Sequence, residues 1–109
     1  MQGAWLDAAT GLVRARLQGM HLRLPGRGSD GPTLEIHSYG ETGARPLSMP
    51  NDTGYGHVAL SPEDVSSAVR ELVAHRGKVL GEITSTTVVG VGDLEVTYVR
   101  DPEGSIIEL

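Results

Sequence analysis

Three ionisable residues lie between apolar or small neighbours in segments that are predicted to be strands: Glu35, His57 and Glu108. Side chains alternate between the two faces of a strand, so each group points away from the face that its neighbours share. If those neighbours face a packed helix, then all three ionisable groups face the opposite side of the sheet. A curved sheet can bring that side to one point, so the spacing predicts a shared site.

One imidazole and two carboxylates are a suitable donor set for a divalent cation such as Zn²⁺, Ni²⁺, Co²⁺, Mn²⁺ or Fe²⁺. With open positions beside these ligands, a substrate carbonyl or diol oxygen could bind and be polarised. Loss of the proton next to that carbonyl would then be easier, because the cation stabilises the enediolate. Glu35 or Glu108 could be the base. The alternative is that these side chains simply face solvent, as acidic residues in antiparallel sheets commonly do.

Four further side chains are candidates for contact with a substrate: His21, Arg23, His37 and Tyr98. The strand alternation puts His37 on the face of Glu35 and His21 on the face of Arg23. A guanidinium such as that of Arg23 can receive a carboxylate or a phosphate. The same residues could instead face water, and the sequence leaves both interpretations open.

Length and composition bound the class of protein. The chain has 109 residues, which indicates one domain, and its formal net charge of −5 disfavours nucleic acid or an anionic membrane as partner. No apolar run approaches the roughly 20 residues of a membrane span, and the first residues do not resemble a secretory signal. Cysteine is absent, so disulfides and thiolate zinc sites are excluded. We expect a cytoplasmic protein that acts on a small molecule.

The first half of the chain predicts little regular structure beyond one hairpin. Residues 4–10 have the pattern of a short helix that ends at Gly11. Alternating apolar and polar residues at 20–24 and 33–39 predict two strands. The intervening residues 25–32 are dense in Gly and Pro, which favours an antiparallel hairpin over about residues 18–39. We place a linker at residues 46–54.

The second half predicts a strand, a helix and three more strands. The helix is expected over residues 62–76, with Ser61 as N-cap, capping-box spacing from Ser61 to Asp64, and Gly77 as the stop. Strands are expected at residues 55–60, 78–87, 94–100 and 105–109. Residues 101–104, Asp-Pro-Glu-Gly, are typical of a tight turn. The chain is therefore expected to have an α+β fold.

Three segments, residues 33–39, 55–60 and 98–109, resemble the vicinal oxygen chelate superfamily. That group includes glyoxalase I, methylmalonyl-CoA epimerase, extradiol dioxygenases and the bleomycin and fosfomycin resistance proteins. The resemblance implies βαβββ modules that form a curved mixed sheet. Residues 55–109 match a complete module, whereas residues 1–45 match a first module that lacks its first strand and helix. By this resemblance, Glu35, His57 and Glu108 match metal ligands, while the ligand of the missing strand has no counterpart.

The resemblance implies a metal-dependent lyase, isomerase or epimerase of the glyoxalase type, acting on a small oxygenated metabolite through an enediolate. A non-catalytic protein that binds a drug or antibiotic is the alternative, and a dioxygenase is the second. Without the missing helix, the apolar side chains of the hairpin, Met20, Leu22 and Ile36 among them, lack a cover. We expect either residues 4–16 or a second chain in a homodimer to cover them.

Overall fold

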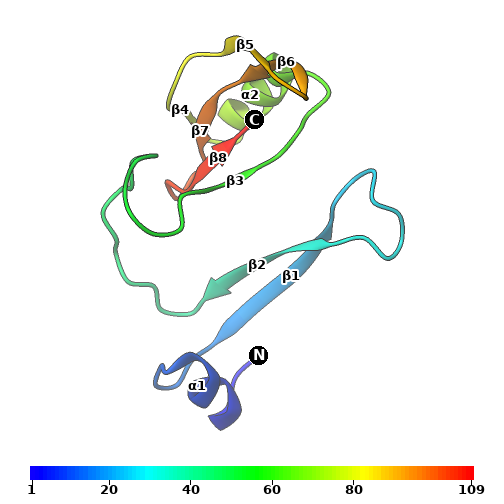
Figure 1. Ribbon diagram of the computed structural model, residues 1–109. Coiled ribbons are helices and arrows are strands. Elements are labelled where there is room, and N and C mark those ends of the chain that lie inside the picture. The colour runs from blue at the N-terminus through cyan, green and yellow to red at the C-terminus, as the bar shows by residue number, and fades with distance from the viewer. The chain divides into compact units, whose positions relative to one another are not determined.

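The computed structural model describes all 109 residues, which form two compact units, Met1–Arg45 and Pro46–Leu109. Unit 1 contains helix α1 (Ala4–Thr10) and strands β1 (Leu17–Arg23) and β2 (Thr33–Tyr39), as Figure 1 shows. The expected short helix is confirmed and ends at Gly11, which has a left-handed φ of 71°. Leu6 of the helix is buried with Ala15 and Leu17, and Tyr39 packs against them.

The two strands of unit 1 form the predicted antiparallel hairpin. Its register pairs His21 with Glu35 and Gly19 with His37. Directly paired residues share a face of a hairpin, so His21, Glu35 and His37 project from the same side. The predicted sharing of one face by Glu35 and His37 is therefore confirmed within this unit, and the register adds His21 to that face.

The opposite face of the hairpin stays open. Met20 is 59% exposed, Leu22 41% and Ile36 49%. Of the two covers that the sequence analysis considered, residues 4–16 folded back over these side chains are excluded, because Leu6 and Ala15 pack around Leu17 and Tyr39 and leave Met20, Leu22 and Ile36 exposed.

Unit 2 contains a four-stranded sheet with helix α2 beside it (Figure 1). The strands run in the order β3 (His57–Ala59), β8 (Ile106–Glu108), β7 (Tyr98–Arg100), β4 (Lys78–Val79). β3 and β8 are parallel, and the other pairs are antiparallel. The parallel pair requires a crossover, which α2 (Val65–Ala74) and the strands after it provide. Together with unit 1, this arrangement makes the chain an α+β protein.

Each of the two long strands that the sequence predicts within residues 78–100 is divided in two. A separate ribbon of β5 (Thr84–Val88) and β6 (Gly92–Val96) follows β4 and precedes β7. The break is a bulge, because the backbone N–H groups of Leu80 and Gly81 both donate to the carbonyl of Tyr98. On the other strand, Thr97 exchanges backbone hydrogen bonds with Leu109 and donates its hydroxyl to Gly81.

Helix α2 is shorter than the predicted span of residues 62–76 at both ends. Its N-cap is Asp64 and not Ser61, because the Asp64 carboxylate accepts the N–H of Ser67. At the other end Arg76 adopts the left-handed φ of 71°. Gly77 instead leaves room for Leu72, since a Cβ there would lie 1.9 Å from the Leu72 Cδ2 atom. Neither α1 nor α2 is long and apolar enough to cross a membrane.

The segment that follows Arg45 is tied to the sheet of unit 2 by a buried cation. The guanidinium of Arg100 donates to the carbonyls of Gly104 and Ser48 and contacts the Met49 sulfur. Gly104 lies close to Leu47, so a Cβ at Gly104 would approach the Leu47 Cδ2 atom within 2.3 Å. Arg100 thus fixes part of the predicted linker against the turn before β8.

The Asp64 cap predicts a pH dependence of stability. The pKa of Asp64 lies below its usual 3.8. The largest cause is a hydrogen bond with the Ser67 side chain, and the next is the hydrogen bond from the Ser67 backbone N–H. A lowered folded-state pKa adds stability that is present above pH 3.8 and is lost as the pH falls through the folded value. The free energy of unfolding should therefore fall more steeply for the native chain than for Asp64→Asn between about pH 6 and about pH 2.5 in urea titrations.

Glu63→Gln is the matched control, because it removes the same charge one residue earlier without removing the cap. This variant should keep the pH slope of the native chain. An equal slope in Asp64→Asn would contradict the role of Asp64.

Candidate active site

Unit 2 brings together three of the predicted site residues: His57, Tyr98 and Glu108. The Nε2 atom of His57 lies 2.8 Å from Oε2 of Glu108, and the Tyr98 hydroxyl donates to that same oxygen at 3.0 Å. The rings of His57 and Tyr98 meet edge to face, with their centroids 5.1 Å apart. The three side chains therefore form one hydrogen-bonded cluster.

The strand register explains how residues so far apart in sequence meet. Glu108 is directly opposite Tyr98 in the antiparallel pair β7–β8 and opposite Ala59 in the parallel pair β3–β8. His57 lies two residues before Ala59 and hence on the same face. Val99, which is fully buried, occupies the other face of the sheet. His57 and Glu108 side chains remain 31% exposed and are open to a ligand.

The environment of Tyr98 in this cluster raises the pKa of its hydroxyl. The hydrogen bond to Glu108 raises the pKa of Tyr98 above 10.0, and burial and the Glu108 charge add to the shift. Tyr98 therefore remains a hydrogen-bond donor at neutral pH and orients the carboxylate of Glu108.

The imidazole and the carboxylate suit a divalent cation. Adjacent ligands of an ion with bonds of about 2.1 Å lie roughly 3 Å apart in octahedral geometry, and the separation of Nε2 and Oε2 is 2.8 Å. To bind an ion there, the Nε2 atom of His57 must present its lone pair in place of a proton. In neither unit do three His, Asp or Glu side chains form a group that could hold a metal ion.

Glu35 lies in unit 1 and has two histidine partners. Its Oε1 atom is 2.6 Å from Nε2 of His37 and 3.3 Å from Nε2 of His21. The hydrogen bond from His37 lowers the pKa of Glu35; desolvation opposes this shift, and the charges of His37 and His21 add to it. Both imidazoles contact the same carboxylate oxygen of Glu35.

Arg23, a substrate candidate in the sequence, is engaged locally. Its guanidinium donates to the carbonyls of Gly28 and Ser29 in the turn that joins β1 and β2. Sequence patterns did not single out the buried Arg100, or the pair Arg14 and Arg16, which lines a pocket in unit 1. The alternation of basic residues at 14 and 16, just before a predicted strand, was the available signal for that pair.

Comparison with known proteins gives the family. The model of the Glyoxalase/Bleomycin resistance protein/Dioxygenase superfamily matches residues 14–109. The chain belongs to this superfamily. The resemblance of residues 33–39, 55–60 and 98–109 is thereby confirmed.

A solved structure supports the same superfamily fold. A glyoxalase family protein from Bacillus cereus is similar to the whole of this chain, with a TM-score of 0.78 and 23% sequence identity. The match covers 70% of that protein's chain. None of the curated proteins matches this chain.

Substitution of Gly19 tests the contacts of Glu35 with His21 and His37. A Cβ at Gly19 would lie 2.6 Å from the His37 Cδ2 atom, so the imidazole crosses the strand over a residue without a side chain. Gly19→Ala should displace His37 and remove its hydrogen bond to Glu35. The pKa of Glu35 should then rise towards its usual value, which an NMR titration of the carboxyl carbon can measure.

Gly43→Ala serves as the control, because the added Cβ would meet nothing within 4 Å. It should leave the pKa of Glu35 unchanged. An unchanged pKa in Gly19→Ala as well would mean that His37 does not set the ionisation of Glu35.

Proposed function

We propose that this protein is a divalent-metal-dependent lyase, isomerase or epimerase of the glyoxalase type that acts on a small oxygenated metabolite through an enediolate. The observation that carries the proposal is the 2.8 Å approach of His57 Nε2 and Glu108 Oε2 on neighbouring strands. Membership of the superfamily supports it. The proposed ligands are Glu35, His57 and Glu108, with Zn²⁺, Ni²⁺, Co²⁺, Mn²⁺ or Fe²⁺ as the candidate ions.

The residues of the chain have separate roles in this proposal. A divalent cation at these ligands supplies Lewis acidity that polarises a substrate carbonyl oxygen. Glu35 or Glu108 takes the proton from the neighbouring carbon and can return it, as an isomerase or epimerase requires. Tyr98 holds Glu108 in place by its hydrogen bond. His21, Arg23 and His37 of unit 1 and Tyr98 of unit 2 are proposed to contact the substrate.

The alternative is a metal-free protein that binds a small molecule, such as a drug or antibiotic. It is favoured by the fact that the Oε2 atom of Glu108 already has two partners, His57 and Tyr98. A dioxygenase is the second alternative within the same superfamily.

A homodimer remains part of the proposal. The open apolar face of the hairpin, with Met20, Leu22 and Ile36, is the surface that a second copy would cover. Burial of apolar area contributes about 25 cal/mol per Å², so such a contact would stabilise both chains.

Metal removal and replacement test the enzyme proposal. The chain stripped with a chelator should gain thermal stability when Zn²⁺ or Ni²⁺ is added, because an ion at 100 times its Kd stabilises the folded state by about 2.7 kcal/mol. Glu108→Gln and His57→Gln should lose most of this gain. Metal-dependent exchange of the proton next to the carbonyl, followed by NMR in deuterated water with small hydroxycarbonyl compounds, should be abolished in Glu108→Gln.

Glu82→Gln is the control, because it removes an exposed charge of the same unit outside the cluster. This variant should respond to metal as the native chain does. A chain that gains no stability from either ion would favour the metal-free alternative, and retained exchange in Glu108→Gln would remove Glu108 from the mechanism.

A further inference from the structure

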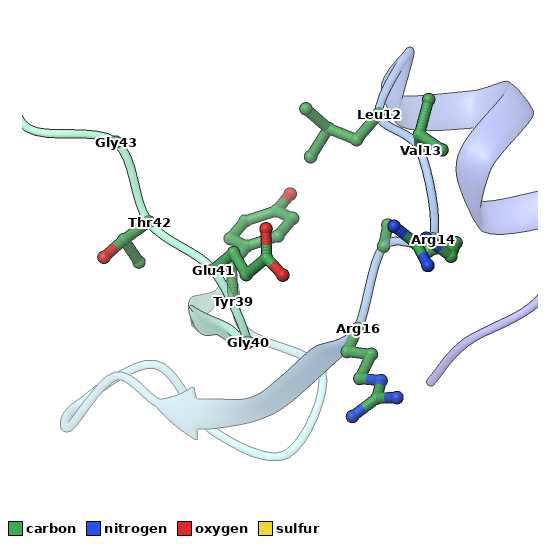
Figure 2. Close-up of a pocket in the computed structure, with 10 residues that line it drawn as sticks. Leu12, Val13, Arg14, Arg16, Tyr39, Gly40, Glu41, Thr42 and Gly43 are labelled. Atoms are coloured by element: carbon green, nitrogen blue, oxygen red, sulfur yellow. The ribbon is translucent and has the colours of Figure 1, made fainter.

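A pocket of about 510 Å³ lies within unit 1, where the segment that enters β1 runs beside the segment that leaves β2 (Figure 2). Residues 12–16 form one wall and residues 39–43 the other. The backbone N–H of Gly40 donates to the carbonyl of Arg16 at 2.9 Å and joins the two walls at the base. None of these residues belongs to the proposed metal site.

The pocket has an excess of positive charge. Arg14 and Arg16 lie on one wall, and Tyr39 and Glu41 lie on the other, as Figure 2 shows. Neither Arg14 nor Arg16 takes part in an ion pair. The lining contains two arginines and one glutamate, so it carries a net positive charge in a chain whose net charge is −5, and the Asp7 carboxylate is bound to the backbone of the wall that carries the arginines.

Residues 12–16, the wall that carries both arginines, have an unusual backbone conformation at Arg14. Arg14 has a φ of 56°, which side-chain-bearing residues rarely adopt. The Asp7 carboxylate fixes it there by accepting the N–H groups of Arg14 at 3.0 Å and Ala15 at 2.7 Å. A strained residue that is held by specific hydrogen bonds beside a pocket is typical of a binding site. A fixed backbone also reduces the entropy that Arg14 loses on binding a ligand.

The second wall leaves room for Arg16 and contributes apolar surface. A Cβ at Gly40 would lie 3.2 Å from the Arg16 Cβ atom, so a glycine lets this wall approach the arginine stem closely. Leu12 is 48% exposed and Val13 85%, and both line the pocket together with the half-buried Tyr39. Exposed apolar side chains next to unpaired cations suit a ligand that has both an anionic and an apolar part.

We propose that this pocket binds a small organic anion, with its carboxylate or phosphate group paired to Arg14 and Arg16. The apolar part of the anion lies against Leu12, Val13 and Tyr39. Guanidinium groups suit both oxyanions, because their N–H donors match carboxylate and phosphate oxygens in pairs. Glu41 opposes the anion and limits its affinity.

The experiment uses four probes that share a phenyl group and differ in charge: phenylacetate, phenyl phosphate, benzyl alcohol and benzylamine. Amide chemical shifts of the full chain report each titration. Phenylacetate or phenyl phosphate should shift the amides of residues 12–16 and 39–43, and benzyl alcohol should bind at least about tenfold more weakly. The stronger of the two anions identifies the head group that the pocket prefers. Affinity should fall with added salt, because these charges are exposed.

Three variants separate the charges of the pocket. Arg16→Gln should raise the Kd of the preferred anion at least about tenfold, and Glu41→Gln should lower it. Arg27→Gln removes an arginine in the turn outside the pocket and should leave the Kd unchanged. Arg14→Gly removes the other guanidinium while accepting the positive φ without strain, so it should fold and bind weakly.

Three results would overturn the proposal. The first is that neither anion shifts these amides at millimolar concentration. The second is that benzylamine binds as tightly as the anions. The third is that Arg14→Gly and Arg16→Gln bind with the native Kd. The variants leave His57 and Glu108 intact, so the metal response distinguishes failure here from failure of the proposed enzyme activity.

Discussion

Strand β8 is the element on which the candidate site depends, because it is hydrogen-bonded on both sides, parallel to β3 and antiparallel to β7. The tight turn before it fixes its position: Asp101 accepts the N–H groups of Glu103 and Ser105, and Gly104 takes a φ of 90°. This register puts Glu108 opposite Tyr98 and on the face of His57. A shift of the strand register by one residue would turn the Glu108 side chain to the opposite face of the sheet and break its contacts with His57 and Tyr98.

Local patterns predict much of this arrangement, because strand alternation and turn residues act over a few positions. The hairpin of unit 1, the short helix before Gly11 and the turn before β8 follow directly from such patterns. That Glu35 and His37 share a face follows as well, since period-two alternation decides it, whereas the register that places His21 opposite Glu35 was not predicted. The same alternation predicted that His57 and Glu108 share a face, although not that Tyr98 would bridge to Glu108.

The predicted bounds of α2 and of the strand over residues 78–87 are wrong because specific hydrogen bonds override the general preferences of residues for caps and strands. Ser61 and Asp64 are both good N-caps, and the N–H of Ser67 is bonded by Asp64, which shortens α2. The strand predicted over residues 78–87 is broken because Leu80 and Gly81 compete for one carbonyl, a bulge that β propensity does not encode. Buried Arg100 was missed because its partners, the carbonyls of Gly104 and Ser48, are set by tertiary folding. Arg14 and Arg16 were missed because the pocket that they line forms only where residues 39–43 run beside them. The convergence of Glu35 with the cluster of unit 2 stays a prediction.

Crystallographic location of the metal, by anomalous diffraction from protein loaded with Zn²⁺, tests the proposed site most directly. The proposed site predicts a peak at about 2.0–2.2 Å from both His57 Nε2 and a Glu108 carboxylate oxygen, with Glu35 of the same chain or of a second copy completing the ligands. An ion bound elsewhere, with the hydrogen bond between His57 and Glu108 intact, would contradict it.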